Sequence, residues 1–186
     1  MLSKQSVLPA VKKPKDIDRL IDSDTEVIIL LETRLSSLQQ VVKKVKQAGK
    51  RVIIHVDMIQ GLKTDQYGME FIGHNVKPDG IISTRTNIIQ LAKKYQLITI
   101  QRVFLIDSQA IEHNLELIKQ TKPDYVELLP GVMPHVIAYV HEALQTDAVG
   151  IVAGGLIREQ QDVDLARQAG VSAVSTSLRE LWDFDV

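Results

Sequence analysis

The sequence contains no cysteine and few aromatic residues. The absence of cysteine from all 186 residues excludes disulfide bonds and thiolate metal ligands. Aromatic residues make up 4% of the chain, which weakens the hypothesis of an extended base-stacking surface for nucleic acid. No apolar run is long enough to cross a membrane, and residues 1–11 lack the apolar stretch of a signal peptide. We therefore expect a cytoplasmic protein with one domain, residues 1–186.

The net charge of −1 excludes a strong overall attraction for nucleic acid. A nucleic-acid partner would have to bind a local basic patch. Lys43, Lys44 and Lys46 on one predicted helix form the best candidate for RNA binding, and Lys12, Lys13 and Lys15 in a predicted loop form a second. Each group taken singly is more typical of an ordinary solvated surface than of a nucleic-acid contact.

Strand-like and helix-like segments alternate from end to end. The predicted strands are residues 6–11, 26–32, 51–59, 80–84, 97–104, 125–129, 149–153 and 171–174. The predicted helices are residues 16–22, 35–48, 67–75, 87–95, 110–120, 134–144, 160–169 and 178–184. Strict alternation indicates a parallel sheet, and eight units favour closure into a compact α/β barrel of the (β/α)8 TIM type. Because the chain is shorter than the ~250 residues usual for that fold, an open doubly wound sheet is the alternative.

Polar residues interrupt strands that should be apolar on both faces. In residues 51–59 the even-numbered positions are all apolar, so we expect the odd-numbered His55 and Asp57 to face the barrel interior. Gln60 and a glycine follow at the predicted mouth of the barrel. The same alternation within residues 125–129 places Glu127 inward.

Buried carboxylates require a hydrogen-bonding or charged partner. Arg85 and Arg102 lie at or near strand ends and are candidate partners for Asp57 and Glu127. The pattern does not show whether Gln101 or Arg102 faces inward. Other interpretations stay open: His55 as a core histidine, Asp57 with Arg85 as a structural ion pair, and Arg102 as a residue extended along the barrel rim.

Glycines and hydroxyl residues follow the last two strands. Gly154 and Gly155 come after residues 149–153, and Ser175, Thr176 and Ser177 come after residues 171–174. Each group precedes a predicted helix, where backbone N–H groups and the helix dipole favour anions, and TIM barrels bind phosphate after these strands. With the inward carboxylates, which accept hydrogen bonds from hydroxyls, this predicts a pocket for a phosphorylated small polyol. The glycine pair by itself also fits a tight turn.

Six segments in order resemble the glycerol uptake operon antiterminator family, and the resemblance covers nearly the whole chain. They are residues 55–62, 80–85, 100–108, 127–131, 153–157 and 173–177. The resemblance implies a TIM-type barrel that responds to glycerol 3-phosphate and acts on the leader mRNA of glycerol utilisation genes. We predict that the ligand-binding residues are His55, Asp57, Gln60, Arg85, Arg102, Glu127, Gly131, Gly154, Gly155, Ser175, Thr176 and Ser177.

The alternative hypothesis is a TIM-barrel isomerase or lyase that acts on a small phosphorylated polyol or sugar. No predicted strand ends in a lysine suited to a Schiff base, and no cluster of residues has metal-ligand spacing. Asp57, Glu127 or His55 could still act as a general base. The resemblance favours a regulator with no catalytic residue, metal or cofactor, whose partners are glycerol 3-phosphate and leader mRNA, without a membrane. Oligomeric state, including a homodimer, stays open.

Overall fold

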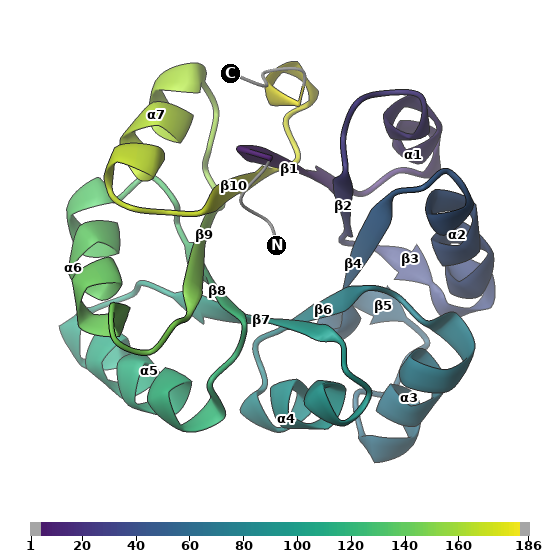
Figure 1. The fold of residues 1–186 in the computed structure, drawn as a ribbon, viewed down its shortest axis with the longest axis horizontal. Coiled ribbons are helices and arrows are strands. Elements are labelled where there is room, and N and C mark those ends of the chain that lie inside the picture. The colour runs from purple at the N-terminus through teal and green to yellow at the C-terminus, as the bar shows by residue number, and fades with distance from the viewer. Residues whose placement is uncertain (1–4, 183–186) are drawn as a thin grey trace. The chain divides into compact units, whose positions relative to one another are not determined.

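The computed structural model describes residues 5–182, and its eight longer strands form a closed parallel barrel (Figure 1). Their order around the barrel is β1-β10-β9-β8-β7-β6-β4-β2. This confirms the predicted TIM-type fold, and the open sheet is wrong. The strands are β1 (Val7–Val11), β2 (Val27–Leu30), β4 (Arg51–His55), β6 (Gly80–Ser83), β7 (Ile98–Phe104), β8 (Tyr125–Leu129), β9 (Gly150–Gly154) and β10 (Ala173–Thr176).

A helix follows nearly every barrel strand, as predicted. The α-helices are α1 (Pro14–Ile21), α2 (Leu35–Gln47), α3 (Gln66–Phe71), α4 (Thr86–Lys94), α5 (Ser108–Thr121), α6 (Pro134–Leu144) and α7 (Gln160–Gln168). The last predicted helix, residues 178–184, is only the 3-10 helix η3 (Arg179–Leu181), and its final two positions lie outside the described residues.

The core forms from apolar strands and one apolar face of each helix. All four residues of β2 are buried, as expected for a parallel strand covered on both faces. On α2, Leu38, Val42 and Val45 are buried at helical spacing. Burial of each such side chain stabilises the fold by about 1.5–3 kcal/mol. Gly49, with a φ of 76°, adopts the left-handed conformation that commonly ends a helix.

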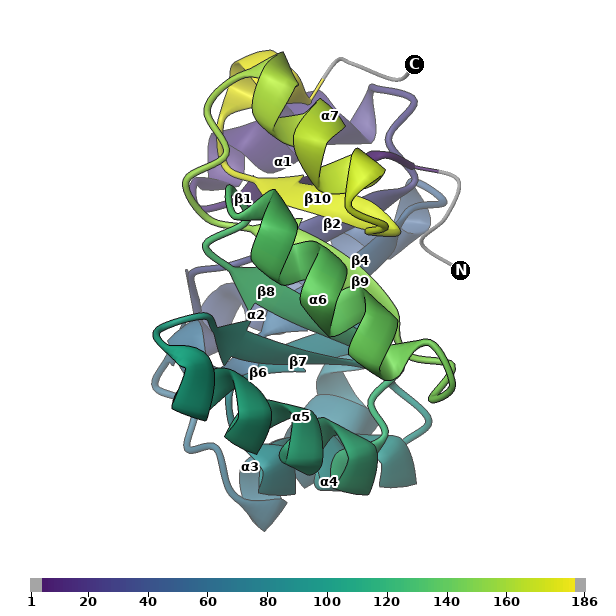
Figure 2. The same ribbon diagram turned by 90° about the vertical axis from the view of Figure 1, so that its left-hand side faces the viewer.

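The chain divides into two compact units, one of residues 10–99 and the other of the residues before and after them. In the first unit, β2 pairs with residues 10–11 of β1 and with β4, which pairs with β6. In the second, β8 pairs with β7 and β9, and β10 pairs with β9 and with residues 7–9 of β1. Figure 2 shows α5, α6 and α7 of the second unit side by side, outside its strands. The single domain stays a prediction.

Two segments differ from the sequence-based expectation. The strand predicted for residues 51–59 ends at His55, and a 3-10 turn, η1 (Val56–Met58), follows. Next, β5 (Ile59–Gln60) pairs with β3 (Thr33–Arg34) in a small two-stranded parallel sheet that the sequence analysis did not predict. Both strands have only two residues, too few for a period-two pattern to be detected.

The helix predicted for residues 67–75 is also interrupted. After α3 the chain continues as a π-helix, η2 (Ile72–Val76), and then reverses at Lys77, whose φ is 54°. Gly73 lies in this segment against the ring of Tyr95, where an added Cβ would come within 2.5 Å of the ring. A side chain at this position would therefore force the segment away from α4.

Candidate functional site

Glu127 is the centre of a buried polar cluster in the unit that contains β7 to β10. Its side chain is only 2% exposed. The Nε of Arg102 donates to one carboxylate oxygen at 2.7 Å, and the Oγ of Ser175 donates to the other at 2.7 Å. The predicted need for a partner is confirmed, since a guanidinium and a hydroxyl offset the cost of burying this charge.

The structure also shows which of the adjacent residues Gln101 and Arg102 faces the cluster. The Oγ1 of Thr121, on α5, donates to the side chain of Gln101 at 2.7 Å. Gln101 therefore points toward the helix layer. Because side chains alternate along a strand, Arg102 points the opposite way, onto the face where Glu127 lies beside it in register.

Glycines let the backbone approach this cluster closely. A Cβ on Gly154 would come within 2.4 Å of the Ser175 Oγ and 3.0 Å of a Glu127 carboxylate oxygen. A Cβ on Gly131 would come within 2.8 Å of the Gly154 nitrogen, and the Gly131 N–H donates to the Gly155 carbonyl at 3.0 Å. The chain turns left-handed at Gly155, whose φ is 74°. These three glycines therefore lie together at the carboxyl ends of β8 and β9.

The hydroxyl residues after β10 are partly engaged by the protein. Ser175 donates to Glu127, and Thr176 donates to the Ile157 carbonyl at 3.4 Å and accepts the Leu178 N–H at 3.1 Å. Ser177 is exposed. The donors suited to an anion here are thus main-chain N–H groups and Ser177, rather than all three hydroxyls.

The helix that follows β9 does not present an open N-terminus. A carboxylate oxygen of Asp162 accepts the N–H groups of Arg158 at 2.8 Å and Glu159 at 3.2 Å. The terminal helix is a single 3-10 turn whose dipole is small. The two helix N-termini that the sequence suggested as anion sites therefore contribute less than expected, because one is capped and the other is short.

Asp57 is the centre of a second cluster, in the unit of residues 10–99. It lies in η1, just beyond β4, so it is not a strand residue as predicted. Its carboxylate accepts the Ser83 Oγ at 3.0 Å, the Thr84 N–H at 2.8 Å and the Thr84 Oγ1 at 3.2 Å. These bonds tie the end of β4 to the end of β6 and satisfy the charge without an arginine.

Arg85 lies beside this cluster but is only loosely attached to it. Its Nε is 3.8 Å from the Asp57 carboxylate, too far for a hydrogen bond, and its side chain is 54% exposed. Its Nη1 donates to the Thr64 Oγ1 at 2.5 Å. Arg85 therefore forms a long ion pair with Asp57 rather than a hydrogen bond.

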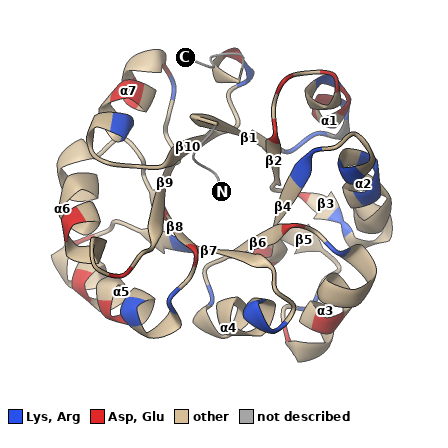
Figure 3. Cartoon of the chain, viewed as in Figure 1, with Lys and Arg blue, Asp and Glu red and all other residues tan. Residues whose placement is uncertain are grey.

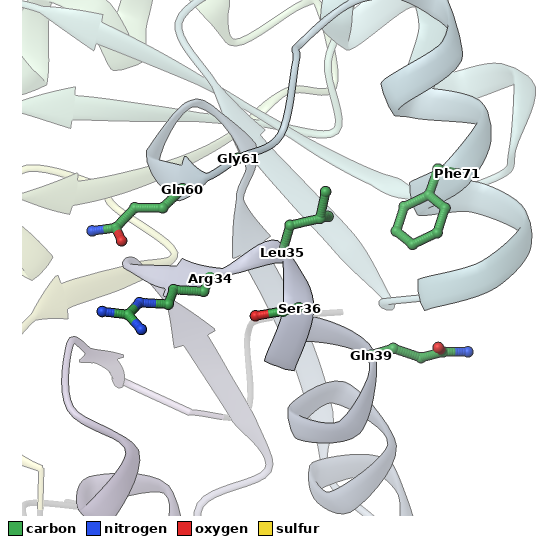
Figure 4. A pocket seen from close by; sticks show the side chains of 7 residues that line it. All are labelled: Arg34, Leu35, Ser36, Gln39, Gln60, Gly61 and Phe71. Atoms are coloured by element: carbon green, nitrogen blue, oxygen red, sulfur yellow. The ribbon is translucent and has the colours of Figure 1, made fainter.

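Two further predicted residues occupy different environments. His55 is buried at the end of β4 and is 2% exposed. Gln60 is exposed in β5, where it lines an open groove of about 740 Å³ together with Arg34 and Phe71 (Figure 4). Arg34 and Phe71 are not among the residues predicted from the sequence, because the sheet of β3 and β5 that positions this groove was not predicted.

The predicted RNA-binding lysines lie on α2, where Figure 3 shows basic residues. Lys44 forms an ion pair with Asp18, and the Nζ of Lys46 is 3.1 Å from an Asp79 carboxylate oxygen. Lys43 is exposed and, within residues 5–182, forms no ion pair. The patch stays a prediction with less uncompensated charge than the sequence suggested.

The described residues contain neither a metal-binding cluster nor a membrane-spanning helix. No group of three or more His, Asp or Glu side chains within residues 5–182 is placed to hold a metal ion. No helix in that range is long and apolar enough to span a membrane.

The closed parallel barrel makes the chain a (β/α)8-barrel protein, with one polar cluster around Glu127 of β8 and another around Asp57, just beyond β4. Within that class, residues 7–182 match the family model of the glycerol-3-phosphate responsive antiterminators, and the chain belongs to this family. The predicted resemblance is confirmed.

Three relatives cover nearly the whole chain. The crystal structure of a glycerol uptake operon antiterminator regulatory protein from Listeria monocytogenes is 38% identical, with a TM-score of 0.93 over 98% of this chain and 97% of that one. That of an antiterminator-related protein from Thermotoga maritima is 28% identical, with a TM-score of 0.84 over 97% and 99%. The uncharacterized protein YgcP of Escherichia coli is 33% identical over 98% of this chain and 94% of its own length.

Proposed function

We propose that this chain binds glycerol 3-phosphate and, in response, acts on the leader mRNA of glycerol utilisation genes to prevent premature termination or stabilise the transcript. The observation that carries the proposal is the family match over residues 7–182. A protein that acts on these transcripts would be located in the cytoplasm.

The cluster around Glu127 has the chemistry that this ligand requires. A carboxylate offers about four lone-pair sites, and Arg102 and Ser175 each occupy one, so sites remain for the hydroxyls of a glycerol moiety. Arg102 has five N–H donors, and its bond to Glu127 uses the one at Nε. We propose that its remaining N–H groups, together with the main chain at Gly154 and Gly155 and with Ser177, bind the phosphate.

The same contacts argue for a binding protein rather than an enzyme. Both oxygens of Glu127 already accept a strong hydrogen bond, and Asp57 accepts bonds from Ser83 and Thr84. These bonds engage both carboxylates in contacts within the protein. We therefore propose that neither residue acts as a general base.

Calorimetric titration with glycerol 3-phosphate tests the ligand, with glycerol and inorganic phosphate as controls. We expect the ester to bind at least tenfold more tightly than either control, and Glu127→Gln to weaken binding of the ester at least tenfold. Glu116→Gln, a change of the same kind at an exposed position of α5, should have no effect.

Asp57→Ala tests separately whether the second cluster contributes. Equal affinity for the ester and for phosphate would contradict the ligand assignment, and steady turnover of the ester would contradict the regulatory role.

The RNA step requires its own measurement. We expect the leader transcript of a glycerol utilisation operon to bind the purified protein more tightly at saturating glycerol 3-phosphate than without it. Fluorescence anisotropy of the labelled transcript would measure both dissociation constants. The same affinity with and without the ester would refute a response to the ligand at the level of RNA binding.

A further inference from the structure

An open groove lies beside the small sheet of β3 and β5, within the unit of residues 10–99. It has a volume of about 740 Å³, in the range of pockets that hold small organic molecules. Figure 4 shows the side chains of Arg34 and Gln60 together at one end, Phe71 and Gln39 at the other, and Leu35 between them. The groove therefore has a charged polar end and an aromatic end.

The aromatic end is exposed although aromatic residues are scarce in this chain. Phe71, on α3, is 37% exposed, and Tyr67, four residues earlier on the same helix, is 78% exposed. Residues four apart lie on the same side of a helix, so both rings face solvent on one side of α3, and Phe71 lines the groove. Exposed rings of this kind provide the faces on which the bases of single-stranded RNA stack.

The charge of the groove suits a phosphodiester chain. Arg34 forms no ion pair within the described residues, and no carboxylate among them lines the groove. Glu32 lines the adjoining smaller pocket with Arg34, and its carboxylate lies 4.0 Å from the Nζ of Lys12. Gln39 donates through its amide nitrogen to the Asn75 carbonyl, which leaves its amide oxygen as an acceptor. Amide side chains of this type hydrogen-bond to base edges, while an arginine binds a phosphate.

The groove is also connected to the cluster around Asp57. Gln60 and Gly61 form part of its wall, and Thr64, three residues further along, accepts the hydrogen bond from Arg85. A ligand that drew Arg85 away from Thr64 would remove one contact of the segment that follows the groove wall. A surface whose affinity for RNA depends on an effector requires such a connection.

We propose that this groove is a contact surface for single-stranded leader RNA, in which a base stacks on Phe71 and the adjoining phosphate binds Arg34. This inference rests on the proposed function and specifies the RNA surface that the family relationship leaves open. It differs from the lysine patch predicted from the sequence, because Lys44 and Lys46 each pair with an aspartate, whereas Arg34 forms no ion pair in the described part of the chain.

Substitution of the ring tests the proposal by anisotropy with the labelled leader transcript at saturating glycerol 3-phosphate. Stacking of one base contributes about 1–3 kcal/mol, so Phe71→Ala should raise the dissociation constant about 5- to 150-fold. Phe71→Leu retains apolar volume but removes the ring, and it should also weaken binding. Tyr139→Ala, at a ring on α6 that is 49% exposed, is the matched control and should leave binding unchanged.

Substitution of the arginine tests the phosphate contact. Arg34→Ala should weaken binding and reduce the slope of log affinity against log salt by about 0.7, the value for one phosphate of a single strand. Lys119→Ala, at an exposed position of α5, should leave that slope unchanged.

The outcomes separate this inference from the proposed function. Failure of the unmodified protein to bind the transcript would refute the RNA function itself. Normal RNA binding by Phe71→Leu and Arg34→Ala, in an unmodified protein that does bind, would refute the groove alone. Loss of RNA binding together with unchanged affinity for glycerol 3-phosphate in calorimetry would support the groove and would show that the variants are folded.

Discussion

Gly154→Ala tests the close packing of backbone and side chains around Glu127. The new methyl group would lie 2.4 Å from the Ser175 Oγ and 3.0 Å from a Glu127 oxygen, and real Cβ atoms are essentially never found within 3.0 Å of a neighbour. Either β9 must shift away from β10, or Ser175 must rotate and release its bond to Glu127.

Both responses have a calculable cost. Overpacking of a well-packed site costs about 1–3 kcal/mol. Loss of a hydrogen bond to a charged acceptor costs about 1.5–3 kcal/mol. The protein will take the less costly response, so we expect Gly154→Ala to lower the free energy of unfolding by about 2 kcal/mol. For a chain of this length that corresponds to a fall in Tm of roughly 4–8 °C.

A double-mutant cycle identifies the cause of that loss. Ser175→Ala removes the atom that the new methyl group would strike, so Gly154→Ala should cost less in that background than in the unmodified protein. We expect the two losses of unfolding free energy, measured by urea titration, to fall short of additivity by about 1 kcal/mol or more. Strict additivity, or a cost of Gly154→Ala below about 0.5 kcal/mol, would refute the clash.

Three further changes have expected outcomes. Arg102→Met should lower the unfolding free energy in urea by about 3–5 kcal/mol, because it leaves Glu127 buried with one fewer partner, and adding Glu127→Gln should restore part of the loss. The N–H group of Gly68, at the start of α3, donates to Asp65 and lowers the pKa of this carboxyl group below its ordinary 3.8. The contribution of Asp65 to stability is therefore present above that pH and is lost as the pH falls. Amide exchange of α3 in Asp65→Ala should differ from that in the unmodified protein near neutral pH and converge with it in acid. The hydrogen bond to Glu112 raises the pKa of Tyr139 above 10.0, so Glu112→Gln should shift its ultraviolet titration to lower pH.

The period-two rule placed Glu127 correctly because it sits in the middle of a regular strand. The same rule was only partly right for Asp57, since β4 ends at His55 and Asp57 follows in a 3-10 turn. Asp57 accepts hydrogen bonds from Ser83, which is 26 residues further along the chain, and from Thr84, which is 27 residues further along. No local pattern in residues 51–59 contains that information.

The inward-facing residue of the pair Gln101 and Arg102 was undetermined for a related reason. Both side chains are polar, so neither disturbs the alternation more than the other. The deciding contact comes from Thr121, 20 residues further along on α5, which bonds to Gln101. The sequence of a strand shows which of its side chains face inward only when one face of the strand is apolar. Otherwise the orientation depends on contacts with the neighbouring helix.

Lysines grouped on one helix are the local pattern from which the uncompensated charge of the surface was predicted least accurately. Lys43, Lys44 and Lys46 form a basic group in the sequence, yet two of them pair with Asp18 and Asp79, which belong to other segments of the same unit. Arg34 is a single cation that no sequence pattern emphasises, but it has no such partner in the described residues. Because a phosphate binds uncompensated charge rather than charge that already has a carboxylate, Arg34 is a stronger candidate for RNA contact than Lys44 or Lys46.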